Sequence, residues 1–208
     1  MGVKKEELLP IRPAGRLILT IGRDLIKSPA AAILELVKNA YDADSPSVKV
    51  AIIADKTACK VIISVEDTGH GMTEAVVKDS WLVPATGDKQ RRKQSPKGRV
   101  LQGRKGVGRF AAAILGESLF LETTANNKKT TVNLDWRTFE QAQYLDDVKI
   151  KVVSETVNAP SGTRIEVIGS KDYLEQWSEK QLERMEYELK KLIPPIAEDS
   201  SGFTINDQ

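Results

Sequence analysis

Two neighbouring segments rich in valine and isoleucine, residues 48–54 and 60–66, constrain the fold more than any other feature of the sequence. Each is typical of a β-strand, and the link that starts at Asp55 is short enough for a hairpin. Further strand-like segments cluster later in the chain, near residues 118–124, 129–135, 147–154 and 163–168. Because the strands are clustered rather than alternating with helices, the pattern predicts an α+β fold and not a parallel βαβ fold.

The helical patterns lie before, between and after these strands. Ser28 and Pro29 supply an N-cap and a first-position proline for a helix over residues 30–43, which Pro46 ends. Other helices are expected at residues 17–26, 73–81, 110–115 and 173–192. The long polar stretch over residues 84–104 has no apolar period and is typical of a functional lid.

Composition excludes several classes of protein. Of the 208 residues, 40% are hydrophobic and 29% are charged, which is typical of a folded protein in water. The one cysteine, Cys59, can form no internal disulfide and is expected in the core. The sequence has neither a membrane-spanning apolar stretch nor a signal-peptide pattern, so we expect a cytoplasmic protein that does not contact a membrane.

The helix over residues 30–43 carries the first group of candidate functional side chains. Glu35 and Asn39 are four residues apart and Asp42 follows three later, so all three share one helical face. A glutamate there can polarise a water, and an asparagine carbonyl can bind a hard cation such as Mg²⁺. A solvated polar face is the alternative interpretation of this segment taken alone.

The second candidate segment ends the second strand. Asp67 is followed by Gly69, His70, Gly71 and Met72. A carboxylate at a strand end can accept a hydrogen bond from an exocyclic amine, and glycines allow a flat ring to approach the backbone. A plain Asp-Thr-Gly turn is the alternative. Because His70 is the one histidine in the chain, a multi-histidine metal site is excluded, and we expect His70 on an exposed loop.

The third candidate segment is glycine-rich and covers residues 103–108. It matches neither a Walker A loop nor a Rossmann fingerprint. Glycines directly before a helix nevertheless present backbone N–H groups to a phosphate, and Lys105 and Arg109 would add positive charge. The segment belongs to a basic run, residues 89–109, with nine Lys or Arg and no acid. A structural glycine turn and a nucleic-acid-binding surface are the alternatives.

In this order, the three segments resemble the N, G1 and G2 boxes of the GHKL superfamily of ATPases. The residues Ser161, Gly162 and Thr163 resemble the later Gly-Thr box of that superfamily. The resemblance implies a Bergerat fold, a two-layer sandwich of a mostly antiparallel sheet against helices. Residues 81–89 and the glycine-rich segment look most similar to bacterial MORC-like, heat-shock-chaperone-like ATPases.

The resemblance also implies roles for individual residues and the cofactors ATP and Mg²⁺. Glu35 would be the catalytic base and Asn39 would hold Mg²⁺. Asp67 would accept a hydrogen bond from the adenine amino group, Thr163 would support it through water, and residues 84–104 would form the ATP lid. The remaining nucleotide contacts would come from Gly69, Gly71, Met72, Gly103, Lys105, Gly106, Val107 and Gly108.

A glutamate at position 35 favours hydrolysis, because histidine kinases of the superfamily usually have asparagine there. The chain is expected to divide into an arm and first helix (1–27), an ATP-binding domain (28–193) and a tail (194–208). The tail is too short for the transducer domain that completes many such ATPases, so the sequence predicts the N-terminal part of a larger protein. Slow hydrolysis, a nucleotide-driven switch and an ATP-dependent homodimer are expected, with ATP sensing or nucleic-acid binding as alternatives.

Overall fold

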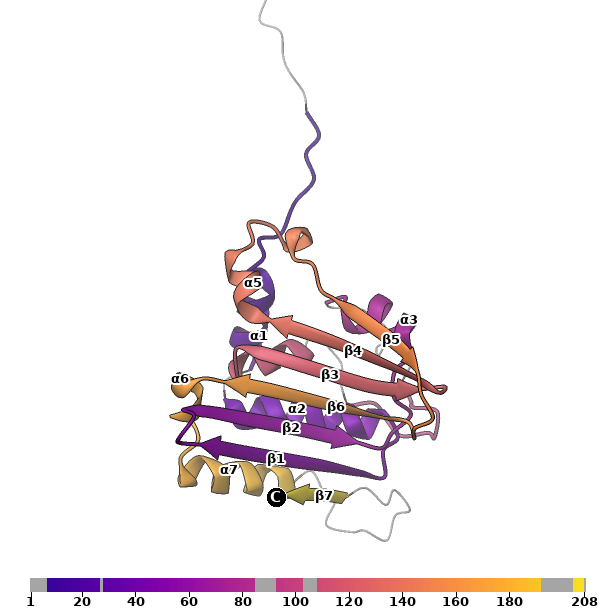
Figure 1. The fold of residues 1–208 in the computed structure, drawn as a ribbon, viewed down its shortest axis with the longest axis vertical. Coiled ribbons are helices and arrows are strands. Elements are labelled where there is room, and N and C mark those ends of the chain that lie inside the picture. The colour runs from indigo at the N-terminus through magenta and orange to yellow at the C-terminus, as the bar shows by residue number, and fades with distance from the viewer. Residues whose placement is uncertain (1–6, 27, 85–92, 103–107, 192–203, 208) are drawn as a thin grey trace, which may run out of the picture.

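A computed structural model describes residues 7–26, 28–84, 93–102, 108–191 and 204–207. Within these residues a seven-stranded sheet has the order β5-β4-β3-β6-β2-β1-β7 (Figure 1). Neighbouring strands are antiparallel except for β1 and β7, which are parallel. The strands are β1 Ser47–Asp55, β2 Lys60–Asp67, β3 Ser118–Ala125, β4 Lys128–Asp135, β5 Val152–Thr156, β6 Gly162–Gly169 and β7 Thr204–Asp207.

Helices form the second layer. Figure 1 shows α2 crossing behind the central strands, while the face of the sheet toward the viewer carries no helix among the described residues. The α+β fold and the two-layer arrangement predicted from the sequence are therefore confirmed. The helices are α1 Leu17–Leu25, α2 Pro29–Asp42, α3 Glu74–Val76, η1 Val77–Trp81 (a π-helix), η2 Gly108–Ile114 (3₁₀), α5 Trp136–Gln141, η3 Leu145–Asp147 (3₁₀), α6 Lys171–Leu174 and α7 Glu179–Lys190.

The helix α2 begins and packs as its sequence predicts. The Ser28 hydroxyl accepts a hydrogen bond from the Ala31 N–H at 3.2 Å, and Pro29 takes the first helical position. The face that carries Ile33, Leu36 and Val37 is buried. It packs over the sheet, where β2 alternates buried and more exposed side chains as a half-buried strand does.

Four predictions about elements were wrong or incomplete. The expected helix over residues 173–192 is split into α6 and α7, because the buried Trp177 and the extended Ser178 interrupt it. The strand expected at 147–154 begins only at Val152, since η3 ends at Asp147 and residues 148–151 form neither helix nor strand. The helix after the glycine-rich segment is 3₁₀, not α. Neither α5 nor β7 was predicted.

Cys59 is exposed, which corrects the expectation that it lies in the core. Its φ of +50° places it in the left-handed region, at the turn between β1 and β2. The apolar residues that follow it belong to β2, so their burial says nothing about the turn itself.

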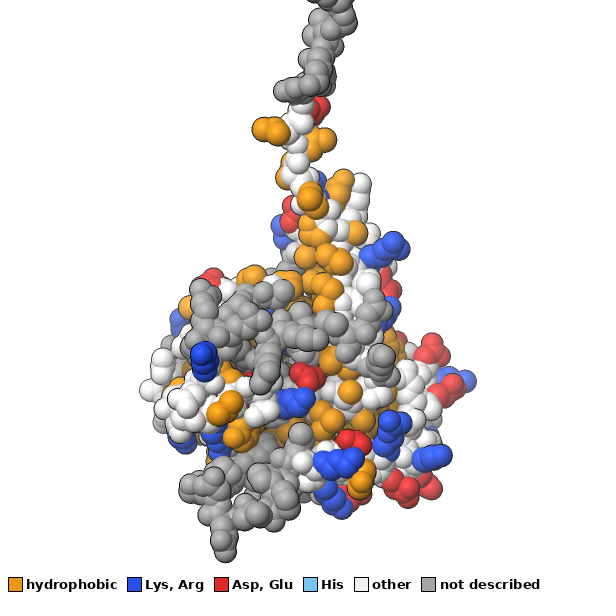
Figure 2. Space-filling model, turned by 180° about the vertical axis from the view of Figure 1, so that it is seen from behind, with side chains coloured by type: hydrophobic (Ala, Val, Ile, Leu, Met, Phe, Trp, Pro, Cys, Tyr) orange, Lys and Arg blue, Asp and Glu red, His pale blue; other side chains and the backbone are white. Residues whose placement is uncertain are grey.

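The N-terminal arm, residues 7–14, extends away from the sheet and helices (Figures 1 and 2). Leu8 and Ile11 are fully exposed, and apolar side chains are visible along the arm in the space-filling view. At its base the Pro13 carbonyl accepts a hydrogen bond from the Leu145 N–H at 2.9 Å. Among the described residues, no helix combines the length and apolar character needed to cross a membrane.

Candidate nucleotide site

Three polar residues form a row across the sheet at the end of β2. The strand register places Asp67 opposite Thr163 on β6, and Thr163 opposite Thr123 on β3. Directly opposed residues of antiparallel strands share a face, so the three side chains lie together. The sequence predicted Asp67 and Thr163 for this site. Thr123 was missed, although it occupies an inward position in the alternating pattern of β3, where a threonine stands out among leucines.

The buried hydroxyl of Thr123 joins this row to the segment that follows β2, residues 67–72, hereafter the G1 loop. It accepts a hydrogen bond from the Met72 N–H at 2.8 Å. The same oxygen lies 3.2 Å from the Gly162 carbonyl oxygen and 3.0 Å from the Thr163 hydroxyl. One side chain thus fixes the end of the G1 loop to two strands.

The glycines of the G1 loop are required by close backbone contacts. A Cβ at Gly69 would lie 2.5 Å from the Ala43 carbonyl oxygen, and one at Gly71 would lie 2.0 Å from the Thr124 carbonyl oxygen. Gly71 also has a φ of +65°, which glycine adopts at little cost. The loop is therefore pressed against the end of α2 on one side and against β3 on the other. His70 is exposed, as expected, and its Nδ1 lies 2.7 Å from the Gly71 carbonyl oxygen.

Burial raises the pKa of Asp67 to about 6, because desolvation penalises the charged carboxylate. Hydrogen bonds from backbone N–H groups of Gly69 and Thr163 act in the opposite direction and lower this pKa. The Gly69 N–H donates to Asp67 Oδ1 at 2.8 Å. A carboxylate offers about four lone-pair positions, so it can accept a further donor from a ligand. A raised acid pKa at a strand end is typical of a functional position.

The polar face of α2 lies beside the end of the glycine-rich segment. A Cβ added at Gly108, the first residue of η2, would lie 3.0 Å from Glu35 Oε2. On the other carboxylate oxygen, Lys38 Nζ donates to Glu35 Oε1 at 2.8 Å, and both side chains are about one-third exposed or less. Asn39 follows one helical turn after Glu35 and is half-buried. The predicted residues Gly103, Lys105, Gly106 and Val107 lie outside the described residues.

A hairpin of residues 93–102, hereafter the Ser95 hairpin, is docked on the C-terminal end of α2. Its own contacts include a bridge between Gln94 and Val100 and the Leu101 N–H donating to the Lys93 carbonyl at 3.2 Å. The buried Asp42 accepts the Gln102 N–H at 2.7 Å through Oδ1. Asp42, which shares the face of Glu35, therefore holds the second half of the segment predicted to be the lid.

Asp44, which the sequence analysis missed, makes the stronger attachment of the Ser95 hairpin. Its Oδ1 accepts the Ser95 hydroxyl at 2.5 Å, and its Oδ2 accepts the Lys97 N–H at 3.0 Å. The Arg99 guanidinium donates to the Tyr41 and Ser45 carbonyls at 3.2 and 2.7 Å. The available signal was an acidic residue two positions beyond Asp42, at the expected end of the helix.

Arg109 ties η2 to the end of η1. Its Nη2 donates to the Ser80 carbonyl at 2.9 Å and to the Val83 carbonyl at 2.5 Å. Burial lowers the pKa of Arg109 to about 10, so it remains charged at neutral pH. The sequence predicts that this side chain adds charge beside phosphates, whereas these bonds direct it to backbone carbonyls.

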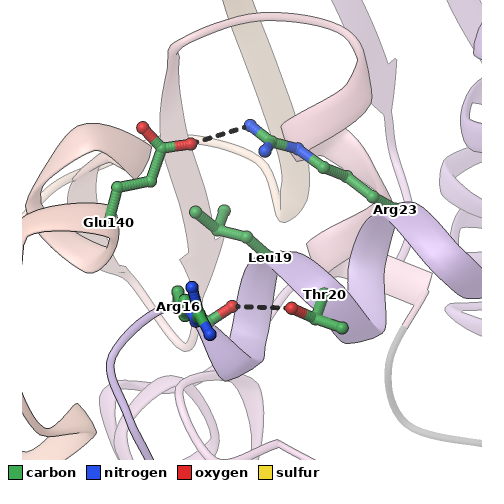
Figure 3. A pocket seen from close by; sticks show the side chains of 5 residues that line it. All are labelled: Arg16, Leu19, Thr20, Arg23 and Glu140. Carbon is green, nitrogen blue, oxygen red and sulfur yellow. Dashed lines mark hydrogen bonds and ion pairs between the residues drawn. The ribbon is translucent and has the colours of Figure 1, made fainter.

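A surface cavity of about 380 Å³ lies between α1 and α5, away from these residues (Figure 3). Its lining residues are Arg16, Leu19, Thr20, Arg23 and Glu140, none of which belongs to the predicted site. Figure 3 shows Arg23 and Glu140 paired across it at 3.1 Å. Because this cavity is lined by none of the predicted residues, it is not the candidate site.

Comparison with known families shows to which class of protein the chain belongs. A comparison with curated proteins gave no significant match. A family model described as "Histidine kinase-, DNA gyrase B-, and HSP90-like ATPase" matches residues 26–163. The match covers most of the chain and includes α2, the G1 loop, the Ser95 hairpin and Thr163. The chain is a member of this family of ATPases.

Proposed function

We propose that this protein binds ATP together with Mg²⁺ and hydrolyses it slowly to ADP and phosphate. The observation that carries the proposal is the row of Asp67 and Thr163, both partly buried, and the buried Thr123 against the G1 loop. A carboxylate whose charged form is destabilised by burial gains from an added hydrogen-bond donor. The amino group of adenine is such a donor, and the Thr163 hydroxyl can hold a bridging water. The row therefore fits an adenine base.

The polar face of α2 supports the phosphate end of the proposed site. Asn39 supplies an amide oxygen, a ligand type that Mg²⁺ accepts, and the metal ion would neutralise phosphate charge. From the sequence motif, Gly103, Lys105, Gly106, Val107 and Gly108 would bind phosphate oxygens. Of these, Gly108 contacts Glu35. The helix α2 would thus hold the metal ion, and the glycine-rich segment, which ends beside α2, would hold the phosphates.

Glu35 is the residue best suited to act on the attacking water. Its carboxylate is half-buried, lies beside Gly108, and can accept the proton of a water at Oε2 while Lys38 holds Oε1. This pairing with Lys38 fixes the orientation of the carboxylate. Slow turnover, which suits a nucleotide-driven switch, is part of the proposal.

The test compares the wild type with Asp67→Asn and Glu35→Gln by titration calorimetry and by phosphate release. Wild-type binding of ATP should require Mg²⁺ and should be lost, by about 100-fold or more in affinity, in Asp67→Asn. Glu35→Gln should bind ATP with unchanged affinity but release no phosphate. Glu155→Gln, at an exposed surface ion pair, is the control for both measurements. Millimolar ATP without a binding signal in the wild type would refute the proposal.

ATP sensing without hydrolysis is the second interpretation, and a wild type that binds ATP but releases no more phosphate than Glu35→Gln would favour it. Nucleic-acid binding by the basic run has less support, because Arg99 and Arg109 donate to backbone carbonyls within the fold. A salt-dependent affinity for DNA in the absence of ATP would favour it. We also propose that, within its family, this protein is most similar to the MORC-like ATPases.

A further inference from the structure

The turn that ends α2, residues 43–45, contacts two segments that are distant in sequence. Toward the G1 loop, the Ala43 carbonyl accepts the His70 N–H at 2.9 Å, and the Ser45 hydroxyl oxygen accepts the Thr68 N–H at 3.0 Å. Toward the Ser95 hairpin, Asp44 makes the two hydrogen bonds described above. Any shift of this turn therefore moves both segments.

Asp44 is locally an unfavourable residue at this position. Its φ is +58°, its N–H donates to the Tyr41 carbonyl at 3.1 Å, and the Ser45 N–H donates to the Ala40 carbonyl at 3.2 Å. This is a Schellman motif, and glycine or asparagine is the usual residue at the left-handed position. An aspartate there also brings negative charge to the negative end of the helix dipole. Both effects oppose aspartate.

The Ser95 hairpin provides the compensation. The Asp44 side chain is buried, with 4% of the residue exposed, and a buried carboxylate is stable only when it is hydrogen-bonded or paired. The Ser95 hydroxyl and the Lys97 N–H supply its hydrogen bonds, and the Arg99 guanidinium brings positive charge to the same helix end. Asp44 thus destabilises the turn in which it lies, and another segment supplies its hydrogen bonds. Such an arrangement points to a contact that has a function.

We propose that Asp44 is a positioning residue for the nucleotide, which couples docking of the Ser95 hairpin to the geometry of the G1 loop. The inference rests on the proposed binding of ATP at that loop. The hairpin ends at Gln102, bound to Asp42, and the glycine-rich segment that follows ends at Gly108, against Glu35. Both flanks of that segment therefore lie on α2. If hairpin and nucleotide favour the same turn geometry, each stabilises the other, because coupling between sites is reciprocal.

The test uses Asp44→Gly, Ser95→Ala and the double variant. Glycine adopts the left-handed conformation readily and removes the charge from the helix end, so Asp44→Gly should keep the melting temperature within a few degrees of the wild type. Each single variant should weaken ATP binding about tenfold, because a buried hydrogen-bonding group loses its partner. The double variant should also lose about tenfold rather than 100-fold, since both changes remove one contact. Cys59→Gly, at a left-handed position in the β1–β2 turn, is the matched control and should bind ATP normally.

Hydrogen exchange supplies a readout that a purely structural role would not change. In the wild type, ATP should slow exchange in residues 67–72 and also in residues 93–102. In Asp44→Gly, ATP should slow exchange only in residues 67–72. Unchanged ATP affinity in both single variants, or losses that multiply in the double variant, would overturn the inference. A wild-type protein that binds no ATP would overturn the proposed function itself, and this result is obtained before any variant is compared.

Discussion

In the protein without ligand, Asp67 is an acidic residue whose carboxylate is largely desolvated, and these two properties conflict. Its folded-state pKa of about 6 lies above its ordinary value of 3.8. The folded state therefore binds this proton more tightly than the unfolded state does. The resulting stability is fully present below about pH 4 and is lost as the pH rises through about 6.

Asp67→Asn should therefore be more stable than the wild type at pH 7, by at most about 3 kcal/mol, and equal to it at pH 4. The measurement is urea unfolding at both pH values. Asp172→Asn, at an exposed position of α6, should show no such pH-dependent difference. Because the same substitution is expected to abolish ATP binding, stability and function should change in opposite directions. A destabilised Asp67→Asn at pH 7 would show that the carboxylate stabilises the row instead.

Single residues also show how far sequence reasoning reaches. Glu35, Asn39 and Asp67 could be selected because their spacing and position at an element's end are visible in the sequence. The contact of Glu35 with Gly108 and the docking of Asp44 on Ser95 could not, since both join segments more than 50 residues apart. Cys59 was misplaced because hydrophobicity was read without the turn geometry, which puts its φ at +50°.

Elements of the site depend on a few buried polar contacts, among them the three that the Thr123 hydroxyl makes. Thr123→Val keeps the shape of the side chain but leaves the Met72 N–H without its acceptor. The free energy of unfolding should therefore fall by about 1–3 kcal/mol. Thr130→Val is the matched control: Thr130 is equally buried and its hydroxyl lies 3.1 Å from the Ser154 hydroxyl, between β4 and β5.

Both substitutions should lower stability, as measured by urea unfolding, whereas only Thr123→Val should weaken ATP binding in calorimetry, by about tenfold. The difference arises because Thr123 holds the G1 loop and Thr130 holds an edge of the sheet. Equal losses of affinity in the two variants would mean that general stability, and not loop position, controls binding.

At the scale of elements, the sequence predicted best where local signals are strong. The start of α2 follows from Ser28 and Pro29, and β1 and β2 follow from their alternating apolar residues. The helix at residues 173–192 was predicted as one piece because the helical pattern shows no break at Trp177. The burial of Trp177, which interrupts the helix, is decided by tertiary packing. β7 was missed because four residues carry no periodic pattern, and they form a strand by pairing with β1.

The whole molecule leaves an apolar arm outside its own core. Leu8, Leu9 and Ile11 are 101%, 75% and 99% exposed, so they contribute little apolar burial to a single copy of the chain. Burying three such side chains in a second copy would stabilise a dimer by roughly 1.5–3 kcal/mol each. These exposed side chains favour the ATP-dependent homodimer that the sequence leads us to expect.

We expect sedimentation velocity to show a shift from monomer to dimer when a non-hydrolysable ATP analogue and Mg²⁺ are added. Leu8→Ser combined with Ile11→Ser should abolish the shift while leaving ATP affinity unchanged, because the arm lies away from the G1 loop. Val153→Ser, at an exposed apolar position on β5, should dimerise as the wild type does. A dimer that persists in the double arm variant would show that another surface joins the copies. Binding of the analogue without any dimer would separate nucleotide binding from assembly, and the arm would then have no role in a second copy.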